Sequence, residues 1–196
     1  MVYYPQTAIG CYTQKQARGT MNLLSALAFC RITLALIFAI SAIAKASNIP
    51  LFKQTIEQFA LIPRPLHTAT VAVLLGGEFA AALLLSIGGA LLWAGFALAF
   101  GLCLVFTLAL AAVLARGAQV ACNCFGASAK AVSADDIRRN SGLMLCALAG
   151  LSLLRPAGQG QAGLSVAEWC LTGLAAAVFS AIWLQLGEIV QLFRHT

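Results

Sequence analysis

The sequence predicts an all-α fold, a polytopic membrane helical bundle with four core transmembrane helices and a fifth at its C-terminal end. Hydrophobic residues make up 61% of the 196 residues, whereas only 9% are charged. A soluble domain is roughly half apolar and about a quarter charged, so this chain lacks the charged surface that keeps a protein in solution. The apolar residues also gather in runs of about twenty, the length that crosses a hydrocarbon core about 30 Å thick.

Five apolar runs are the candidate spans, and each is predicted to be a helix because lipid offers no partners for backbone polar groups. They are residues 23–44, 66–87, 90–114, 141–154 and 166–186. The Gly88-Gly89 pair predicts a tight turn between the second and third runs. The fourth run is short for a full crossing, so its helix is expected to begin earlier, near Ile137.

Polar segments divide the chain into three parts. Residues 1–22 form a polar N-terminal tail, residues 23–154 form the bundle with a cysteine-containing loop at 115–139, and residues 155–196 hold a linker and the C-terminal span. Residues 52–59 read as a short amphipathic helix along the interface, which Pro63 and Pro65 bring to an end. In the last span, Trp169 and Trp183 are placed like interfacial anchors.

The basic residues are spread thinly and do not alternate with aromatic residues, so a nucleic-acid surface is not predicted. With five spans, eight basic residues share a side with the cysteine loop and three lie on the other side. Basic residues collect on the cytoplasmic side of a membrane, so this count favours a cytoplasmic loop.

The loop contains the close cysteine pair Cys122-Asn123-Cys124. Two cysteines one residue apart can close a strained disulfide ring, and strain makes a disulfide more oxidising. Arg116 and Lys130 are near enough in sequence to stabilise a thiolate. The pattern leaves thiol exchange, a soft-metal half-site and no chemistry as open readings. Four cysteines in apolar runs are expected to be small inert hydrophobes: Cys30, Cys103, Cys146 and Cys170.

Arg31 and Glu78 are charged residues well inside the first and second predicted spans. A charge in hydrocarbon costs a few kcal/mol or more, so both are expected to face the bundle interior and can pair with each other. Such a pair would either fix the helix register or line a polar site or proton path. Lys45 is expected to snorkel to the interface, and Asp135 and Asp136 are expected to begin a helix.

Several residues follow one order along the chain. They are Arg31, residues 41–45, residues 59–63, Glu78, Arg116-Gly117, Cys122-Asn123-Cys124-Phe125-Gly126 and Arg139-Asn140. This order resembles the MauE family of methylamine utilisation, within the DoxX-like membrane proteins. The resemblance covers about residues 23–154, and the cysteine segment is its most specific part. Asn123 stands where the family more often has glycine. The asparagine makes the turn stiffer but leaves both thiols in place.

The resemblance implies a membrane component of a thiol–disulfide pathway in the bacterial inner (cytoplasmic) membrane. It would support maturation of a periplasmic, disulfide-containing subunit of the methylamine dehydrogenase type, alongside a thioredoxin-like partner. Cys122 and Cys124 would then be the catalytic, exchanging pair of a thiol–disulfide oxidoreductase. The residues implied to line or support the bundle are Arg31, Lys45, Glu78, Arg116 and Arg139. A periplasmic loop is implied, in conflict with the charge count.

Two other classes of function stay open. The same two thiolates, Cys122 and Cys124, suit a carrier or chaperone for a soft metal or small solute. Alternatively, the protein is a scaffold for another membrane subunit. No cofactor is evident from the sequence, although a quinone is an option as electron acceptor, and no metal ligands are predicted apart from this alternative. Cys11 is a candidate resolving thiol.

Overall fold

The computed structural model describes residues 6–117, 133–157 and 164–194, with side chains described for 22–117, 133–155 and 164–185. These residues form helices and no strand, which confirms the all-α prediction. The α-helices are α1 (Gln6–Ala46), α2 (Ile49–Phe59), α3 (His67–Ile87), α4 (Leu92–Ala115), α5 (Ala134–Ala157) and α6 (Val166–Arg194). Two 3-10 helices, η1 (Arg64–Leu66) and η2 (Gly89–Leu91), precede α3 and α4.

Four of the described helices are long and apolar enough to cross a membrane. The candidate spans are Asn22–Ala46, Arg64–Ile87, Gly89–Ala115 and Val166–Gln185. They correspond to the first, second, third and fifth apolar runs of the sequence. The protein is therefore a multi-pass membrane protein.

Helix α5 corresponds to the fourth run, and it begins at Ala134, well before residue 141. Its 24 residues extend over about 36 Å, long enough to accompany the spans, although its first turns are polar. The start is capped, because the backbone N–H and hydroxyl of Ser133 donate to Asp136 Oδ2 at 3.0 and 3.2 Å. This confirms the predicted helix start and explains how a short apolar run belongs to a full-length helix.

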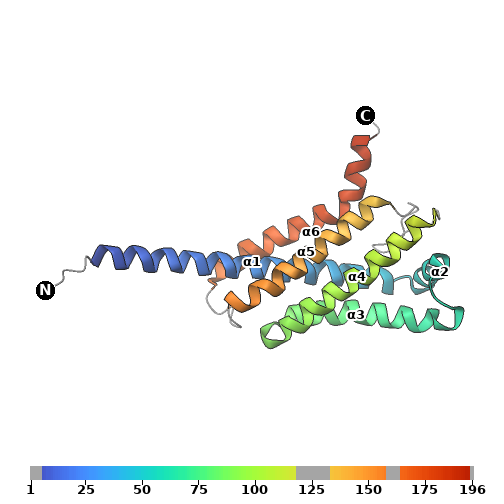
Figure 1. Ribbon diagram of the computed structural model, residues 1–196, viewed down its shortest axis with the longest axis horizontal. Coiled ribbons are helices and arrows are strands. Elements are labelled where there is room, and N and C mark those ends of the chain that lie inside the picture. The colour runs from blue at the N-terminus through green and yellow to red at the C-terminus, as the bar shows by residue number, and fades with distance from the viewer. Residues whose placement is uncertain (1–5, 118–132, 158–163, 195–196) are drawn as a thin grey trace.

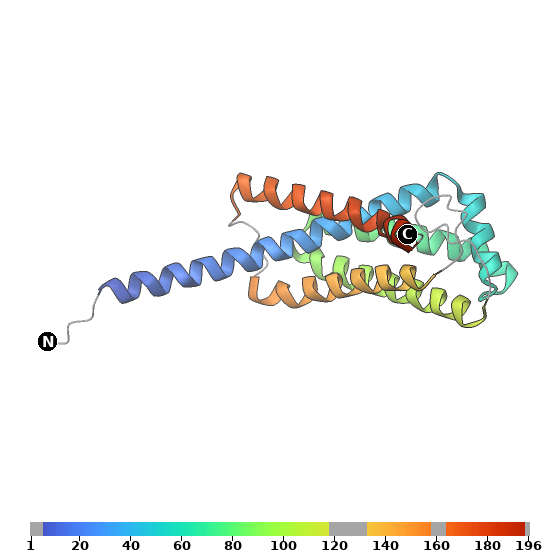
Figure 2. The same cartoon turned by 90° about the horizontal axis from the view of Figure 1, so that it is seen from above.

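Helix α1 lies at the centre of the bundle and packs against α3, α5 and α6, while α4 packs against α3 and α5. Successive long helices alternate in direction, so α2, the end of α4 and the start of α5 lie at one end, here called the α2 end (Figure 1). The turn between α3 and α4 lies at the other, here called the Gly88 end. The segment of α1 before Asn22 projects beyond the bundle (Figure 2), so the predicted tail is helical from Gln6.

Close approach of α5 to its neighbours depends on two glycines. A Cβ atom on Gly150 would lie 2.2 Å from Phe96 Cε1, and one on Gly142 would lie 2.4 Å from Trp183 Cζ2. Trp183 also stacks on Phe179 with ring centroids 5.2 Å apart. Trp183 therefore packs between α5 and α6, where Gly142 leaves a space that the indole fills.

Helix α2 is the short amphipathic helix predicted from the sequence. Asn48 caps it by accepting a hydrogen bond from the Leu51 N–H at 3.2 Å. Its buried residues are Phe52, Thr55 and Ile56. Phe52 and Ile56 pack with Val71 and Leu74 of α3. Helix α2 thus covers one side of the bundle at the α2 end.

Candidate functional site

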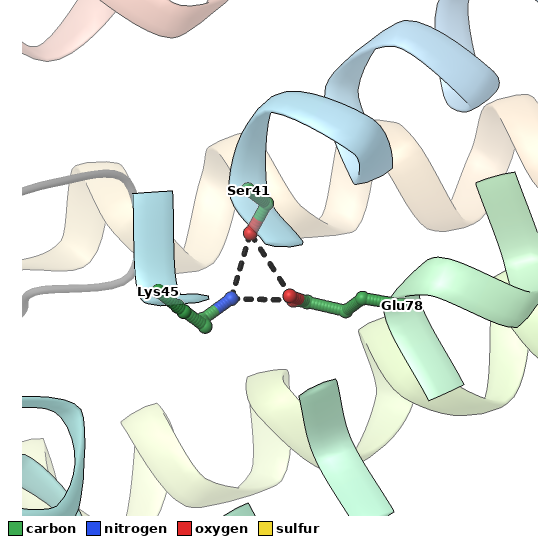
Figure 3. A network of polar contacts seen from close by, with 3 residues as sticks. All are labelled: Ser41, Lys45 and Glu78. Atoms are coloured by element: carbon green, nitrogen blue, oxygen red, sulfur yellow. Dashed lines mark hydrogen bonds and ion pairs between the residues drawn. The ribbon is translucent and has the colours of Figure 1, made fainter. Parts of the chain in front are cut away.

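A buried polar network joins α1 to α3 at the α2 end (Figure 3). Ser41 and Lys45 are four residues apart and share one face of α1, which Glu78 of α3 approaches. Ser41 Oγ donates to Glu78 Oε1 at 3.1 Å, and Lys45 Nζ donates to Ser41 Oγ at 2.6 Å and also to Glu78 Oε1. The three residues are at most 3% exposed. The network is therefore a desolvated ion pair bridged by a hydroxyl.

The sequence suggested that Lys45 snorkels to the interface, but its side chain is buried inside the bundle. Its ammonium group lies 4.9 Å from the ring centroid of Phe106 and 5.5 Å from that of Phe52. Aromatic faces attract a cation, and Glu78 supplies the opposite charge that makes its burial tolerable. Because Phe52 of α2 covers the ammonium group, Lys45 is held inside the bundle.

A small pocket adjoins this network. Its polar or sulfur-bearing lining residues come from α1, α3, α4 and α5, and they are Ser41, Lys45, Glu78, Cys103, Asp136, Arg139 and Asn140. The cavity volume is about 30 Å³, room for one or two water molecules and too little for a quinone ring. Glu78 Oε2 is buried and has no hydrogen-bond partner among the described residues. Glu78 therefore belongs to an ion pair that fixes α1 on α3 and also lines a polar cavity. These are the two roles that the sequence left open.

Helix α5 contributes a second charged pair to the same pocket. Arg139 Nη2 lies 3.6 Å from Asp136 Oδ1, and both side chains are about 15% exposed or less. Arg139 Nη1 also donates to the carbonyl oxygen of Leu184 at 3.3 Å, which ties the start of α5 to α6. Arg139 thus lines the pocket and also joins α5 to α6.

Asn140, which follows Arg139 in the order of residues that resembles the family, joins α5 to α4. Its Nδ2 donates to the carbonyl oxygen of Cys103 at 2.6 Å and to Thr107 Oγ1 at 2.8 Å. This role, and the place of Ser41 and Asp136 in the pocket lining, could not be predicted from hydropathy. For Ser41, its four-residue spacing from Lys45 was the available signal of a shared helix face.

Arg31 lies far from this pocket, at the Gly88 end, and the predicted pairing with Glu78 is wrong. Its guanidinium group donates to the carbonyl oxygens of Leu85 at 2.5 Å and Ser86 at 2.6 Å. The last carbonyls of a helix lack partners within it and carry negative partial charge, so a cation there is stabilising. Arg31 also lies 5.9 Å from the ring centroid of Trp169. Its role is to hold α1 against the end of α3.

Arg116 lies at the α2 end but outside the pocket. It is exposed, and its Nη1 donates to the carbonyl oxygen of Ala60 at 3.4 Å, which links the end of α4 to the end of α2. Apolar contacts reinforce this link, because Leu110 and Val113 of α4 pack with Phe59 and Ile137. Arg116 is thus a supporting residue.

The predicted catalytic pair, Cys122 and Cys124, lies outside the described residues, as does Lys130. The flanking residues Gly117 and Ser133 both lie at the α2 end, where the polar pocket is. The described residues contain no group of three His, Cys, Asp or Glu side chains that could hold a metal ion. Of the predicted site residues that lie in the described part of the chain, Lys45, Glu78 and Arg139 come together at the polar pocket.

A family model described as methylamine utilisation protein MauE matches residues 22–153. The match extends from the first membrane span to the last turns of α5, and so includes every residue of the polar pocket. Neither the curated proteins nor the solved structures contain a match to this chain. The chain belongs to the MauE family, and this membership implies a role in methylamine utilisation.

Proposed function

We propose that this protein is the membrane component of a thiol–disulfide pathway that matures a periplasmic, disulfide-containing subunit of the methylamine dehydrogenase type. Cys122 and Cys124 are the exchanging pair, and a thioredoxin-like periplasmic protein is the direct partner. The observation that carries the proposal is the location of this pair. It lies within the segment that matches the MauE model, between two helices whose ends are firmly braced.

The bracing is supplied by charged and polar residues on both sides of the pair. Arg116 ties the end of α4 to α2, and Arg139 ties the start of α5 to α6. Asn140 joins α5 to α4 directly. A fixed frame of this kind limits the entropy that a connecting segment loses when a partner engages it. The described residues thus suit a stable support for a reactive loop.

The exchange proceeds in two balanced steps. A thiolate of the partner attacks one sulfur of the Cys122–Cys124 disulfide, forms a mixed disulfide and releases the other cysteine as a thiolate, which takes up a proton. The second thiol of the partner loses its proton and attacks the partner's own sulfur in the mixed disulfide. This closes the disulfide of the partner and releases the second loop cysteine as a thiolate, which takes up a proton. Two electrons and two protons thereby pass to the loop pair. The reverse sequence transfers them to the partner, and the two reduction potentials decide the direction.

The structure reduces the excess of basic residues that favours a cytoplasmic cysteine loop, although the sign of the excess stays the same. Of the eight basic residues assigned to the α2 end, Lys45 and Arg139 lie in the bundle and pair with carboxylates. Paired, desolvated cations add little to the charge that a loop presents to a translocation machinery or a lipid surface. The contrast with the Gly88 end is reduced to six against three.

The test replaces the two cysteines in cells that produce the dehydrogenase subunit. Cys122→Ser, Cys124→Ser and the double variant are expected to abolish accumulation of the disulfide-bonded subunit, measured by immunoblot and by counting its free thiols. One single variant should also trap a mixed disulfide with the thioredoxin-like partner on a non-reducing gel. Cys170→Ser is the matched control, because Cys170 is exposed on α6 and lies outside the matched segment.

Normal maturation in the double variant would overturn the proposal. If membrane levels of the protein are equal, that result leaves a scaffold role. Protection of the two thiols by a soft metal, without any mixed disulfide, would instead favour the carrier.

A further inference from the structure

Two cysteines expected to be inert meet inside the bundle. Cys30 of α1 and Cys146 of α5 are 116 positions apart in sequence, yet the Cys146 thiol lies 4.0 Å from the Cys30 carbonyl oxygen. Their side chains also interact directly with each other. The structure holds both as free thiols. Two helices that are not neighbours in the chain thus present one thiol each to the same contact.

The spacing suits a disulfide. A bridged pair has Cα atoms about 4.4–6.8 Å apart, and a cysteine side chain is short. The contact of the Cys146 sulfur with the Cys30 backbone at 4.0 Å places α1 and α5 side by side at these two positions, as a disulfide between them requires. Because no group of three His, Cys, Asp or Glu side chains converges among the described residues, the pair fits a disulfide better than a metal site.

We propose that Cys30 and Cys146 form a second redox-active pair, which a lipid-soluble oxidant of the quinone class converts to a disulfide between α1 and α5. Both thiols are oxidised, one S–S bond forms, and two electrons and two protons pass to the quinone, which leaves as a quinol. This inference goes beyond the proposed function and does not depend on the loop cysteines.

The class of oxidant follows from the location of the pair. Cys30 lies within the span Asn22–Ala46 and is 9% exposed, whereas Cys146 is half-buried on α5. Polar oxidants such as glutathione disulfide do not enter hydrocarbon, since burying their charges costs too much free energy. A quinone partitions into the bilayer and can approach Cys146 from its exposed side. The polar pocket at the α2 end, with a volume of about 30 Å³, is too small for this ligand.

The experiment uses the full chain in lipid nanodiscs, with only Cys30 and Cys146 retained. The other cysteines are replaced by serine: Cys11, Cys103, Cys122, Cys124 and Cys170. Decylubiquinone is added, free thiols are blocked, and the chain is denatured, reduced and labelled with a polyethylene-glycol maleimide. Most chains should gain two labels, and absorbance should report one quinol formed for each chain that gains them.

The matched control moves one thiol by a single position, in the variant Leu145→Cys/Cys146→Ser. Leu145 is 67% exposed, so this thiol points away from Cys30 and should gain no double label. No double labelling of the retained pair, or equal labelling of pair and control, would overturn the inference. If the multiple variant does not fold, the chain carrying only Cys122→Ser and Cys124→Ser is oxidised instead. Peptide mass spectrometry should then find Cys30 linked to Cys146. Absence of this linked peptide would also overturn the inference.

Discussion

Glu78 reaches from the middle of α3 to the ammonium group of Lys45 in the last turn of α1, and neither side chain is more than 2% exposed. Each charge is tolerated in the bundle because the other is present. The pair therefore fixes how far α1 extends past α3, and with it the position of the α2 end. Its removal should disturb the frame that supports the cysteine loop.

Replacing one partner of this ion pair should lower the free energy of unfolding more than replacing both. Lys45→Met leaves the Glu78 carboxylate buried without its partner, and we expect a loss of about 3–5 kcal/mol in the free energy of unfolding. The double variant Lys45→Met/Glu78→Leu should lose less than Lys45→Met alone, because no uncompensated charge remains. Denaturation in mixed micelles measures the free energy of unfolding of Lys45→Met, Glu78→Leu and the double variant. Additive losses from the two single variants would contradict this coupling.

Removal of an exposed ion pair is the control for that experiment. Arg138 pairs with Asp135 at the start of α5, but its side chain is 69% exposed. Solvent screens such a pair, so Arg138→Met should cost about 1 kcal/mol or less. A loss as large as that of Lys45→Met would show that burial is not the deciding factor.

The turn at the Gly88 end should not tolerate a side chain at its first position. Gly88 has φ 84° and ψ −155°, a conformation that is essentially restricted to glycine. A Cβ atom there would also lie 2.7 Å from Nη2 of Arg31. Gly88→Ala is expected to lower stability by about 1–3 kcal/mol, measured as a fall in Tm.

Gly89 provides the comparison. Its φ is 63°, in the left-handed helical region, and no atom lies within 4 Å of the position that an added Cβ atom would take. Gly89→Ala should therefore cost only about 1–2 kcal/mol from backbone strain. Equal effects at the two positions would mean that contact with Arg31 contributes nothing.

Much of this fold follows from the sequence because lipid imposes helices and their minimum length on the chain. The Gly88-Gly89 turn and the start of α5 were predicted because glycine and acidic residues have strong local preferences. The pairing of Lys45 was missed, since hydropathy places a residue in a span but does not say which helix faces it. The contact of Cys30 with Cys146 was missed for the same reason, and the packing of Trp183 was missed because it depends on a glycine of another helix.

Because α4 and α5 pack closely, a side chain added at one glycine of α5 should lower the stability of the protein. Gly150→Ala would place a Cβ atom 2.2 Å from Phe96, which is fully buried, so a loss of about 1–3 kcal/mol is expected. Gly101→Ala on α4 is the control, because no atom lies within 4 Å of the added carbon. Thermal denaturation should show a fall in Tm for the first variant and no fall for the second. An unchanged Tm for Gly150→Ala would contradict the packing described here.

Asn140 should contribute to stability through α4. Asn140→Leu keeps the approximate size of the side chain but removes the donors to Cys103 and Thr107. Hydrogen bonds between helices in membranes contribute about 0.6–2 kcal/mol, and a loss of that order is expected in micelle denaturation. Ser152→Ala is a control, because this hydroxyl is exposed and bonds only to Ala149 of its own helix. If Asn140→Leu leaves the stability unchanged, the two hydrogen bonds contribute nothing to it.

The proposed function is tested most directly by labelling Cys122 and Cys124 on intact cells with a membrane-impermeant maleimide. All other cysteines are replaced by serine, and samples with and without mild prior reduction are compared. We predict labelling only after reduction, which would mean that the pair faces the periplasm and rests as a disulfide. Labelling that requires permeabilised membranes would place the pair in the cytoplasm and contradict periplasmic thiol exchange.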